Sequence, residues 1–151
     1  MKVDSFLKQQ GVDFERHTHT TAYTAQGLAH AEHVSGYSVA KPVIVKTESG
    51  YAMCVLTAPQ HLDRKRVASL LREKEVRLAT EAEMASLFPD CELGAEPPIG
   101  TLFGMPTFAD DKVLEDEFLV MQAGSHRESI RMRREDWERV CRPSIAPIAL
   151  A

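Results

Sequence analysis

Two apolar segments separated by a three-residue turn limit most strongly what this chain can fold into. Residues 39–47 and 51–57 are almost continuously apolar, and Glu48, Ser49 and Gly50 between them are typical turn residues. This pattern predicts a β-hairpin. Because neither arm alternates between apolar and polar side chains, we expect both arms to be central strands that are covered on both faces.

Helices and further extended segments are predicted on either side of this hairpin. Thr24 and Asp63 are suitable N-caps, and Thr80 with Glu83 has the pattern of a capping box. We expect helices at residues 2–10, 24–34, 63–71, 80–88 and 134–140, and extended segments at 12–16, 76–78, 101–109, 117–122 and 128–132. Strands joined by both hairpins and helices indicate an α+β (mixed α/β) fold with a mixed sheet. Residues 143–151 should form an apolar tail that packs on the body or on a second subunit.

The composition indicates one domain over residues 1–151, because 151 residues are enough to bury a core without a metal or disulfide. Cys54, Cys91 and Cys141 are widely spaced and form no C-x-x-C pair, which indicates reduced thiols and a cytoplasmic protein. No apolar run approaches the roughly 20 residues of a membrane span, and the first residues lack the apolar core of a secretion signal. The net charge of −4 disfavours non-specific nucleic-acid binding, so neither a membrane nor DNA is an expected partner.

Residues 94–100 read Gly-Ala-Glu-Pro-Pro-Ile-Gly, so two glycines bracket two prolines. Glycine lets a ligand approach backbone N–H groups, and proline fixes φ so that the loop loses little entropy on binding. The segment is either an ordinary connecting turn or a loop that presents backbone to a ligand. In the second case the N–H donors would come from its non-proline residues, which are Gly94, Ala95, Glu96, Ile99 and Gly100.

Two polar residues lie at the ends of apolar segments. Lys41 is at the entry of the first hairpin arm, where a charge is costly unless it has a partner or reaches solvent. His126 closes the turn Ala123-Gly124-Ser125-His126, which follows the apolar residues 118–121. This histidine is either a surface residue or part of a site.

In this order and spacing, these three features resemble the YbaK/ProX family of aminoacyl-tRNA deacylases, which is similar to the editing domain inserted in bacterial prolyl-tRNA synthetases. The resemblance covers most of the chain, and residues 19–26 are similar to the family's opening segment, where a helix begins beside the pocket. It implies a strongly curved, barrel-like mixed sheet with helices packed outside it. Pro42 departs from the family pattern, in which a small hydroxyl or other donor residue more often follows the lysine.

The resemblance also implies the residues of a site. Its catalytic members would be Lys41, Gly94 and Gly100, and its substrate-binding members would be Tyr23, Thr24, Pro98, Ile99, Asp110, Gly124, Ser125 and His126. A protonated Lys41 would hold a phosphate or carbonyl oxygen of the terminal adenosine, since service as a general base would need a pKa far below about 10.4. His126 would line the amino-acid pocket or orient water, whereas Asp110 with Asp111 could equally form a turn.

No metal or other cofactor is expected. His30 and His33 would lie three residues apart on one helix face, but a third ligand with suitable spacing and the H-E-x-x-H motif are both lacking. Cys54 could in principle be a nucleophile, although its apolar surroundings are more typical of a core thiol.

The implied function is hydrolysis, in trans, of the ester that links a wrong amino acid to tRNA. The expected partner is the acceptor end of mischarged tRNA, with an aminoacyl-tRNA synthetase as a further candidate. The alternative is a non-catalytic module that binds aminoacyl-tRNA or a small ligand. Two groups of basic residues are either solvated surface or a basic rim for tRNA, and they comprise Arg64, Lys65, Arg66, Arg72, Lys74 and Arg77, and then Arg127, Arg131, Arg133, Arg134 and Arg139.

Overall fold

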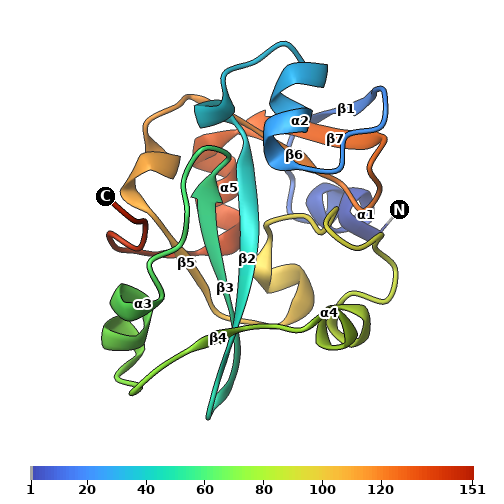
Figure 1. The fold of residues 1–151 in the computed structure, drawn as a ribbon. Coiled ribbons are helices and arrows are strands. Elements are labelled where there is room, and N and C mark those ends of the chain that lie inside the picture. Colours follow the sequence, from blue (N-terminus) through green and yellow to red (C-terminus); the bar gives the residue numbers. More distant parts are fainter. Residues whose placement is uncertain (1) are drawn as a thin grey trace.

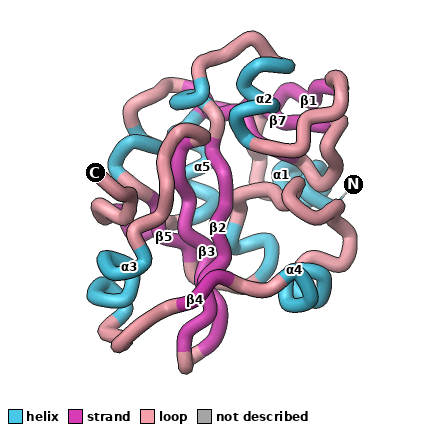
Figure 2. Tube along the Cα trace, viewed as in Figure 1, coloured by secondary structure: helices cyan, strands magenta, loops and turns pink. Residues whose placement is uncertain are grey.

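The computed structural model describes residues 2–151 and arranges their strands in two sheets (Figures 1 and 2). The first sheet has the antiparallel order β1-β7-β6, formed by Phe14–Thr18, Glu128–Arg133 and Phe118–Gln122. The second has the order β4-β2-β3-β5-β8, formed by Arg77–Leu78, Ala40–Thr47, Gly50–Thr57, Thr107–Ala109 and Ser144–Ile145. The predicted α+β class with a mixed sheet is therefore confirmed.

The predicted hairpin is the centre of the second sheet. Strands β2 and β3 pair antiparallel from Ala40 opposite Thr57 to Thr47 opposite Gly50. Strand β4 pairs with the outer side of β2, and β5 runs parallel to β3, so both hairpin arms are central strands as expected. Gly50 has φ +139°, a backbone conformation that side chains other than glycine rarely adopt.

The expected barrel-like sheet is not supported. The two sheets are linked by an isolated parallel bridge between Val39 and Val120, and neither is closed into a barrel. Strands β5 and β8 have three and two residues, so the far edge of the larger sheet is too short to continue a ladder toward the smaller sheet.

The three helices with predicted N-caps begin directly after Thr24, Asp63 and Thr80. The helices are α1 (Lys2–Gln9), α2 (Ala25–Ala31), α3 (Arg64–Leu71), α4 (Glu81–Leu87) and α5 (Arg134–Cys141), with short 3₁₀ turns η1 (Gly36–Ser38), η2 (Gly100–Phe103) and η3 (Asp111–Leu114). The side chains of Thr24 and Asp63 accept hydrogen bonds from backbone N–H groups of the first turns of α2 and α3. Helix α2 ends earlier than expected, because His33 adopts a left-handed φ of 56°. Val67 and Ala68 form the buried side of α3, whereas Leu70 is 41% exposed.

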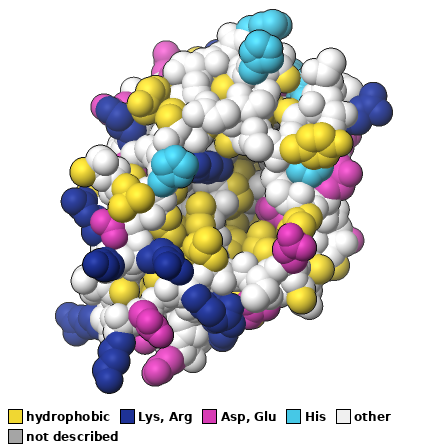
Figure 3. Space-filling model, in the orientation of Figure 1, with side chains coloured by type: hydrophobic (Ala, Val, Ile, Leu, Met, Phe, Trp, Pro, Cys, Tyr) yellow, Lys and Arg dark blue, Asp and Glu magenta, His cyan; other side chains and the backbone are white. Residues whose placement is uncertain are grey.

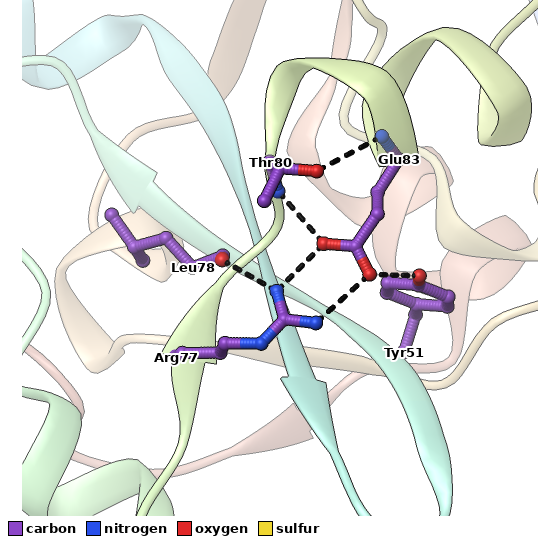
Figure 4. Close-up of polar contacts among 5 residues, drawn as sticks. All are labelled: Tyr51, Arg77, Leu78, Thr80 and Glu83. Atoms are coloured by element: carbon purple, nitrogen blue, oxygen red, sulfur yellow. Dashed lines mark hydrogen bonds and ion pairs between the residues drawn. The ribbon is translucent and has the colours of Figure 1, made fainter.

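The capping box of α4 also fastens that helix and β4 to the hairpin (Figure 4). Thr80 and Glu83 exchange the two predicted hydrogen bonds, at 3.1 and 2.9 Å. Both carboxylate oxygens of Glu83 accept from the Arg77 guanidinium at 2.6 and 3.0 Å, and one also accepts from the Tyr51 hydroxyl. The bond from Arg77, followed by those from Thr80 and Tyr51, holds the pKa of Glu83 far below its ordinary value.

Three hydrophobic clusters hold these elements together. The largest includes Met53, Ile130 and Trp137, and so joins the two sheets to α5. A second lies on the other face of the hairpin and includes Val45, Val67 and Ile148, which places α3 and the C-terminal tail on that face. The tail thus packs on the body of its own chain, where Ile148 is fully buried. The third cluster lies beneath α2.

Candidate functional site

The face of the molecule over β2 is hollowed at its centre (Figure 3). Hydrophobic side chains lie in the hollow, and histidine and basic side chains stand at its rim. Four of the predicted site residues fall into two groups, with Lys41 at the start of β2, and Tyr23, Gly94 and His126 on the loops that follow β1, α4 and β6.

Lys41 lies on the face of the large sheet that also packs against α3. It is directly opposite Leu56 in the β2–β3 register, and Leu56 belongs to the cluster that includes the α3 side chains. Its Nζ donates a hydrogen bond of 2.9 Å to the carbonyl oxygen of Ala58, and burial lowers its pKa. An ammonium group has three N–H donors, so two remain for a ligand beyond this contact within the described chain.

Tyr23, Gly94 and His126 form the second group, although they are distant in sequence. The rings of Tyr23 and His126 lie with centroids 4.9 Å apart, inclined by 53°. A Cβ on Gly94 would be 3.3 Å from Cε1 of His126 and 3.7 Å from the carbonyl oxygen of Tyr23. Tyr23 is 72% exposed and Gly94 is exposed as well, so the group opens to solvent. Three of the predicted site residues are therefore brought together.

His126 ties two loops to each other. Its Nδ1 lies 3.1 Å from the carbonyl oxygen of Ala22, and its Nε2 lies 2.7 Å from that of Leu93. Its backbone N–H donates to Glu92 at 2.8 Å. Because both ring nitrogens face carbonyl acceptors, neither is placed to take a proton from water. The geometry fits a pocket wall better than a general base.

The backbone donors of the 94–100 loop are largely used within the protein. The N–H of Gly94 donates to both carboxylate oxygens of Glu96 at 3.1 Å, and that of Ala95 donates to the carbonyl oxygen of Glu92 at 3.0 Å. The N–H of Ile99 donates to the carbonyl oxygen of Pro97 at 2.8 Å. Glu96 is itself buried, and this burial raises its pKa. The structure therefore argues against these three N–H groups as an oxyanion hole.

Pro98, Ile99 and Gly100 lie on the core side of this loop. The carbonyl oxygen of Pro98 accepts from Trp137, and Ile99 is fully buried in the largest cluster. A Cβ on Gly100 would come within 1.9 Å of Thr107 Oγ1, so a glycine is needed there for close packing against β5. Gly100 was expected to be catalytic, but its close packing against Thr107 is a structural reason for a glycine at this position.

Gly124, Ser125 and Thr24 support the loops around the second group. The N–H of Gly124 donates to Ala95 at 2.8 Å, and its carbonyl oxygen accepts from Glu92 at 2.8 Å. The hydroxyl of Ser125 donates to Glu128 at 3.0 Å, and that of Thr24 caps α2. The backbone of Gly124 and the hydroxyls of Ser125 and Thr24 are therefore already engaged in hydrogen bonds within the protein.

Asp110 is a buried clamp for the C-terminal tail. One carboxylate oxygen accepts from the N–H groups of Ile148 and Ala149 at 3.0 and 3.2 Å, and the other accepts from Gln60 and the N–H of Lys112 at 2.8 and 3.1 Å. Burial acts to raise the pKa of Asp110, but these bonds outweigh it and leave the pKa below its ordinary value. All of its acceptor capacity is used, so the structure does not support a substrate-binding role for this side chain.

The two groups are joined through one hydrophobic cluster. Ala22, next to Tyr23, packs in the same cluster as Ala58, which holds Lys41, and as Val39 at the entry to β2. The cluster therefore connects the backbone that holds Lys41 to the segment that His126 contacts through the carbonyl oxygen of Ala22.

Gln122 contacts the same carbonyl oxygen of Ala22 as His126 does, but it was not among the residues that the sequence singled out. Its Nε2 donates to the carbonyl oxygen of Ala22 at 3.0 Å, and within residues 2–151 its buried Oε1 has no hydrogen-bond partner. A glutamine at the end of an otherwise apolar segment was the available signal. The sequence carries no such signal for Ala58, because Ala58 holds Lys41 with its backbone carbonyl oxygen and not with its side chain.

The described residues contain no group of three or more His, Cys, Asp or Glu side chains that could hold a metal ion. His33 lies beyond the end of α2, so it does not share a helix face with His30. Cys54 is fully buried, as expected of a core thiol, and burial raises its pKa to about 12. Burial also raises the pKa of Cys91 to about 11, so neither thiol is a ready nucleophile near neutral pH.

None of the helices formed by residues 2–151 is long and apolar enough to cross a membrane.

The chain belongs to the aminoacyl-tRNA editing domain family, whose profile matches residues 19–140. The match includes all the residues assigned to the site above. The curated proteins contain no sequence that matches the chain.

Solved structures share the fold at low sequence identity. One, described as a "putative trans-editing enzyme for prolyl tRNA synthetase", is 20% identical with a TM-score of 0.86, over 99% of this chain and 96% of that one. Another, described only as a hypothetical protein, is 18% identical with a TM-score of 0.89, over 99% and 100% of the two chains. A third, described as a "putative signal transduction protein" from Marinobacter aquaeolei VT8, is 16% identical with a TM-score of 0.79, over 99% of this chain and 30% of that one.

Proposed function

We propose that the protein hydrolyses, in trans, the ester of mischarged aminoacyl-tRNA. The observation that carries this proposal is Lys41, partly buried and held by the carbonyl oxygen of Ala58, in a chain of the editing family. One hydrophobic cluster links Ala58 to Ala22, whose carbonyl oxygen His126 contacts. One of the structural neighbours described above is named for the same kind of activity, which adds support at the level of the fold.

Lys41 positions the substrate in this proposal. Its contact with Ala58 fixes the ammonium group and leaves two donors for a phosphate or carbonyl oxygen of the terminal adenosine. With Gly94, Ala95 and Ile99 already engaged, the same cation is the best placed donor for the charge that develops on the ester carbonyl. Burial strengthens its attraction for such a charge because water screens it less.

The ester of aminoacyl-tRNA is already activated, so modest assistance is enough. Orienting a water molecule and holding the ester supply most of what is needed, and a ribose hydroxyl of the tRNA can assist. His126 forms the wall against which the amino-acid side chain lies, and Tyr23 covers it from the solvent side. With these roles for the residues and for the tRNA, hydrolysis requires no Ser-His-Asp triad.

A panel of mischarged tRNAs, each carrying a radiolabelled amino acid, tests the function directly. Single-turnover measurements should show loss of the label from at least one member well above the spontaneous rate. Equal loss with and without the protein across the whole panel would contradict the proposal.

The second candidate is a module that binds aminoacyl ends without turnover. The loops around His126 are internally hydrogen-bonded, as suits a preformed binding pocket, and a related fold occurs in a longer chain described as a signal transduction protein. A protein that binds charged tRNA tightly but leaves the ester intact would favour this second candidate.

A further inference from the structure

The two groups of basic residues differ in how far they are neutralised. Residues 63–77 contain six basic and three acidic residues, a net charge of +3 in a chain of net charge −4. Residues 127–139 contain five basic and four acidic residues, a net charge of +1. The first group is therefore a local excess of positive charge.

Ion pairing widens this difference. In the second group Arg134 pairs with Glu138, Arg139 pairs with Asp136, and Arg131 lies over the ring of Phe118. In the first group Arg66 pairs with Asp63 and Arg77 with Glu83. Within the described part of the chain, the other four members form no side-chain ion pair, and they are Arg64, Lys65, Arg72 and Lys74. All four are exposed.

These cations lie on the same side of the large sheet as Lys41. Val67 and Ala68, on the inner side of α3, pack in one cluster with Leu56, the residue directly opposite Lys41. The outer side of α3 therefore faces solvent on the face that carries the hollow. Figure 3 shows basic side chains gathered at the lower left of that face, where Figure 1 places α3.

We propose that this basic surface, named the α3 surface and formed by Arg64, Lys65, Arg72 and Lys74, binds phosphates of the tRNA acceptor stem while the acceptor end enters the hollow. The proposal rests on the proposed function, since it names the partner that the same site receives. An eight-residue helix extends about 12 Å, and duplex nucleic acid carries one charge per roughly 1.7 Å of axis, so several phosphates lie within its reach.

The charge-neutral double variant Arg64→Gln/Lys65→Gln tests the surface. Its binding to an unacylated proline tRNA transcript is measured by fluorescence anisotropy between 50 and 200 mM salt, conditions in which phosphate contacts contribute strongly. The slope of log affinity against log salt should become shallower by about 0.7–0.9 for each cation removed. The affinity at low salt should fall roughly tenfold, as loss of two phosphate contacts predicts.

The matched control is Arg133→Gln/Arg139→Gln, which removes two exposed cations of the second group and should leave the slope unchanged. Thermal melts establish that both double variants remain folded. An unchanged slope for the α3 variant, an equal loss in the control variant, or equal competition by duplex DNA of the same length would each overturn the proposal. Absence of any tRNA binding by the wild-type protein would overturn it as well.

Deacylation separates this proposal from the proposed function. With full-length mischarged tRNA the α3 variant should show a raised KM and an unchanged kcat, while an aminoacyl-adenosine ester should be hydrolysed as by the wild type. Binding that depends on the α3 surface without hydrolysis of any ester would leave the surface assigned and reject the enzyme. Hydrolysis by the protein, together with an unaltered salt slope for the α3 variant, would support the enzyme and reject the α3 surface.

Discussion

The indole N–H of Trp137 donates a hydrogen bond of 2.9 Å to the carbonyl oxygen of Pro98. This bond joins the buried helix α5 to the 94–100 loop, whose outer residue Gly94 lies against His126. The core therefore sets the position of the 94–100 loop. The candidate site on the outer side of the loop depends on the packing of Trp137, which lies outside the site.

Trp137→Phe should lower the free energy of unfolding by about 2 kcal/mol or more, because it leaves a buried carbonyl without its main donor and removes packed volume. Urea denaturation measures the change. Tyr37→Phe at a residue that is 51% exposed is the control, and its effect should stay within about 0.5 kcal/mol. Equal stability of the tryptophan variant and the wild type would show that the bond does not hold the loop.

Lys41→Met should reduce single-turnover deacylation at least tenfold while leaving the fold intact, because about 1.4 kcal/mol is the smallest loss consistent with its proposed role. Lys46→Met on the same strand is the control and should retain the wild-type rate, since Lys46 lies over the Tyr51 ring away from the site. Near wild-type turnover by a folded Lys41 variant would remove the lysine from the mechanism.

Gly94→Ala should lose stability and activity together. The residue has φ +87°, which costs a side-chain-bearing residue about 1–2 kcal/mol, and its Cβ would press on His126 at 3.3 Å. Thermal melts and deacylation rates are measured on the same preparation. Full activity with unaltered stability would mean that the loop relaxes and that its backbone conformation is not needed.

His126→Ala should change which aminoacyl esters are accepted more than it changes the maximal rate. A pocket wall discriminates by about 1–3 kcal/mol per methylene, so the ratio of kcat/KM between two esters should shift by tenfold or more. The measurement compares an ester with a small side chain and one with a larger side chain. A uniform fall in kcat for both esters would instead assign His126 to the chemical step.

Asp110→Asn should destabilise the protein near pH 6 by about 1–3 kcal/mol, because hydrogen bonds to a charged acceptor are weakened. The pKa of Asp110 is lowered in the folded state, so its stabilising contribution is complete above the unfolded value of about 3.9 and is lost as the pH falls through the folded value. Urea melts from pH 6 downward should therefore show that the difference in unfolding free energy between the variant and the wild type becomes smaller in acid. A difference that grows in acid would contradict the role of Asp110 in holding the C-terminal tail.

Dialysis against a strong chelator should leave deacylation unchanged, since no complete ligand set for zinc or magnesium was found among residues 2–151. If activity is abolished and then restored by zinc, the histidines of this chain will need a new interpretation.

Much of the local structure could be predicted because local rules decide it. The hairpin follows from two apolar runs around Glu48 to Gly50, and the starts of α2, α3 and α4 follow from the caps Thr24, Asp63 and Thr80. The end of α2 could not be predicted, because the left-handed conformation of His33 carries no sequence signature as clear as glycine.

The site could be predicted only in part. Among the residues expected at the site, Tyr23, Gly94 and His126 lie together, whereas Asp110 holds the tail and Ile99 and Gly100 are buried. A glycine or an aspartate that serves packing looks the same in sequence as one that serves a ligand.

The sequence by itself determined the hairpin, the helix starts, the family and the residue types available for chemistry, because propensity, capping and apolar patterning act over a few neighbouring residues. Only the tertiary structure decided that the strands form two sheets, that most donors of the 94–100 loop are already used, and that Ala58 holds Lys41. Those outcomes depend on contacts between distant segments and on backbone atoms. Every residue carries the same backbone atoms, so the sequence does not distinguish the ones that matter.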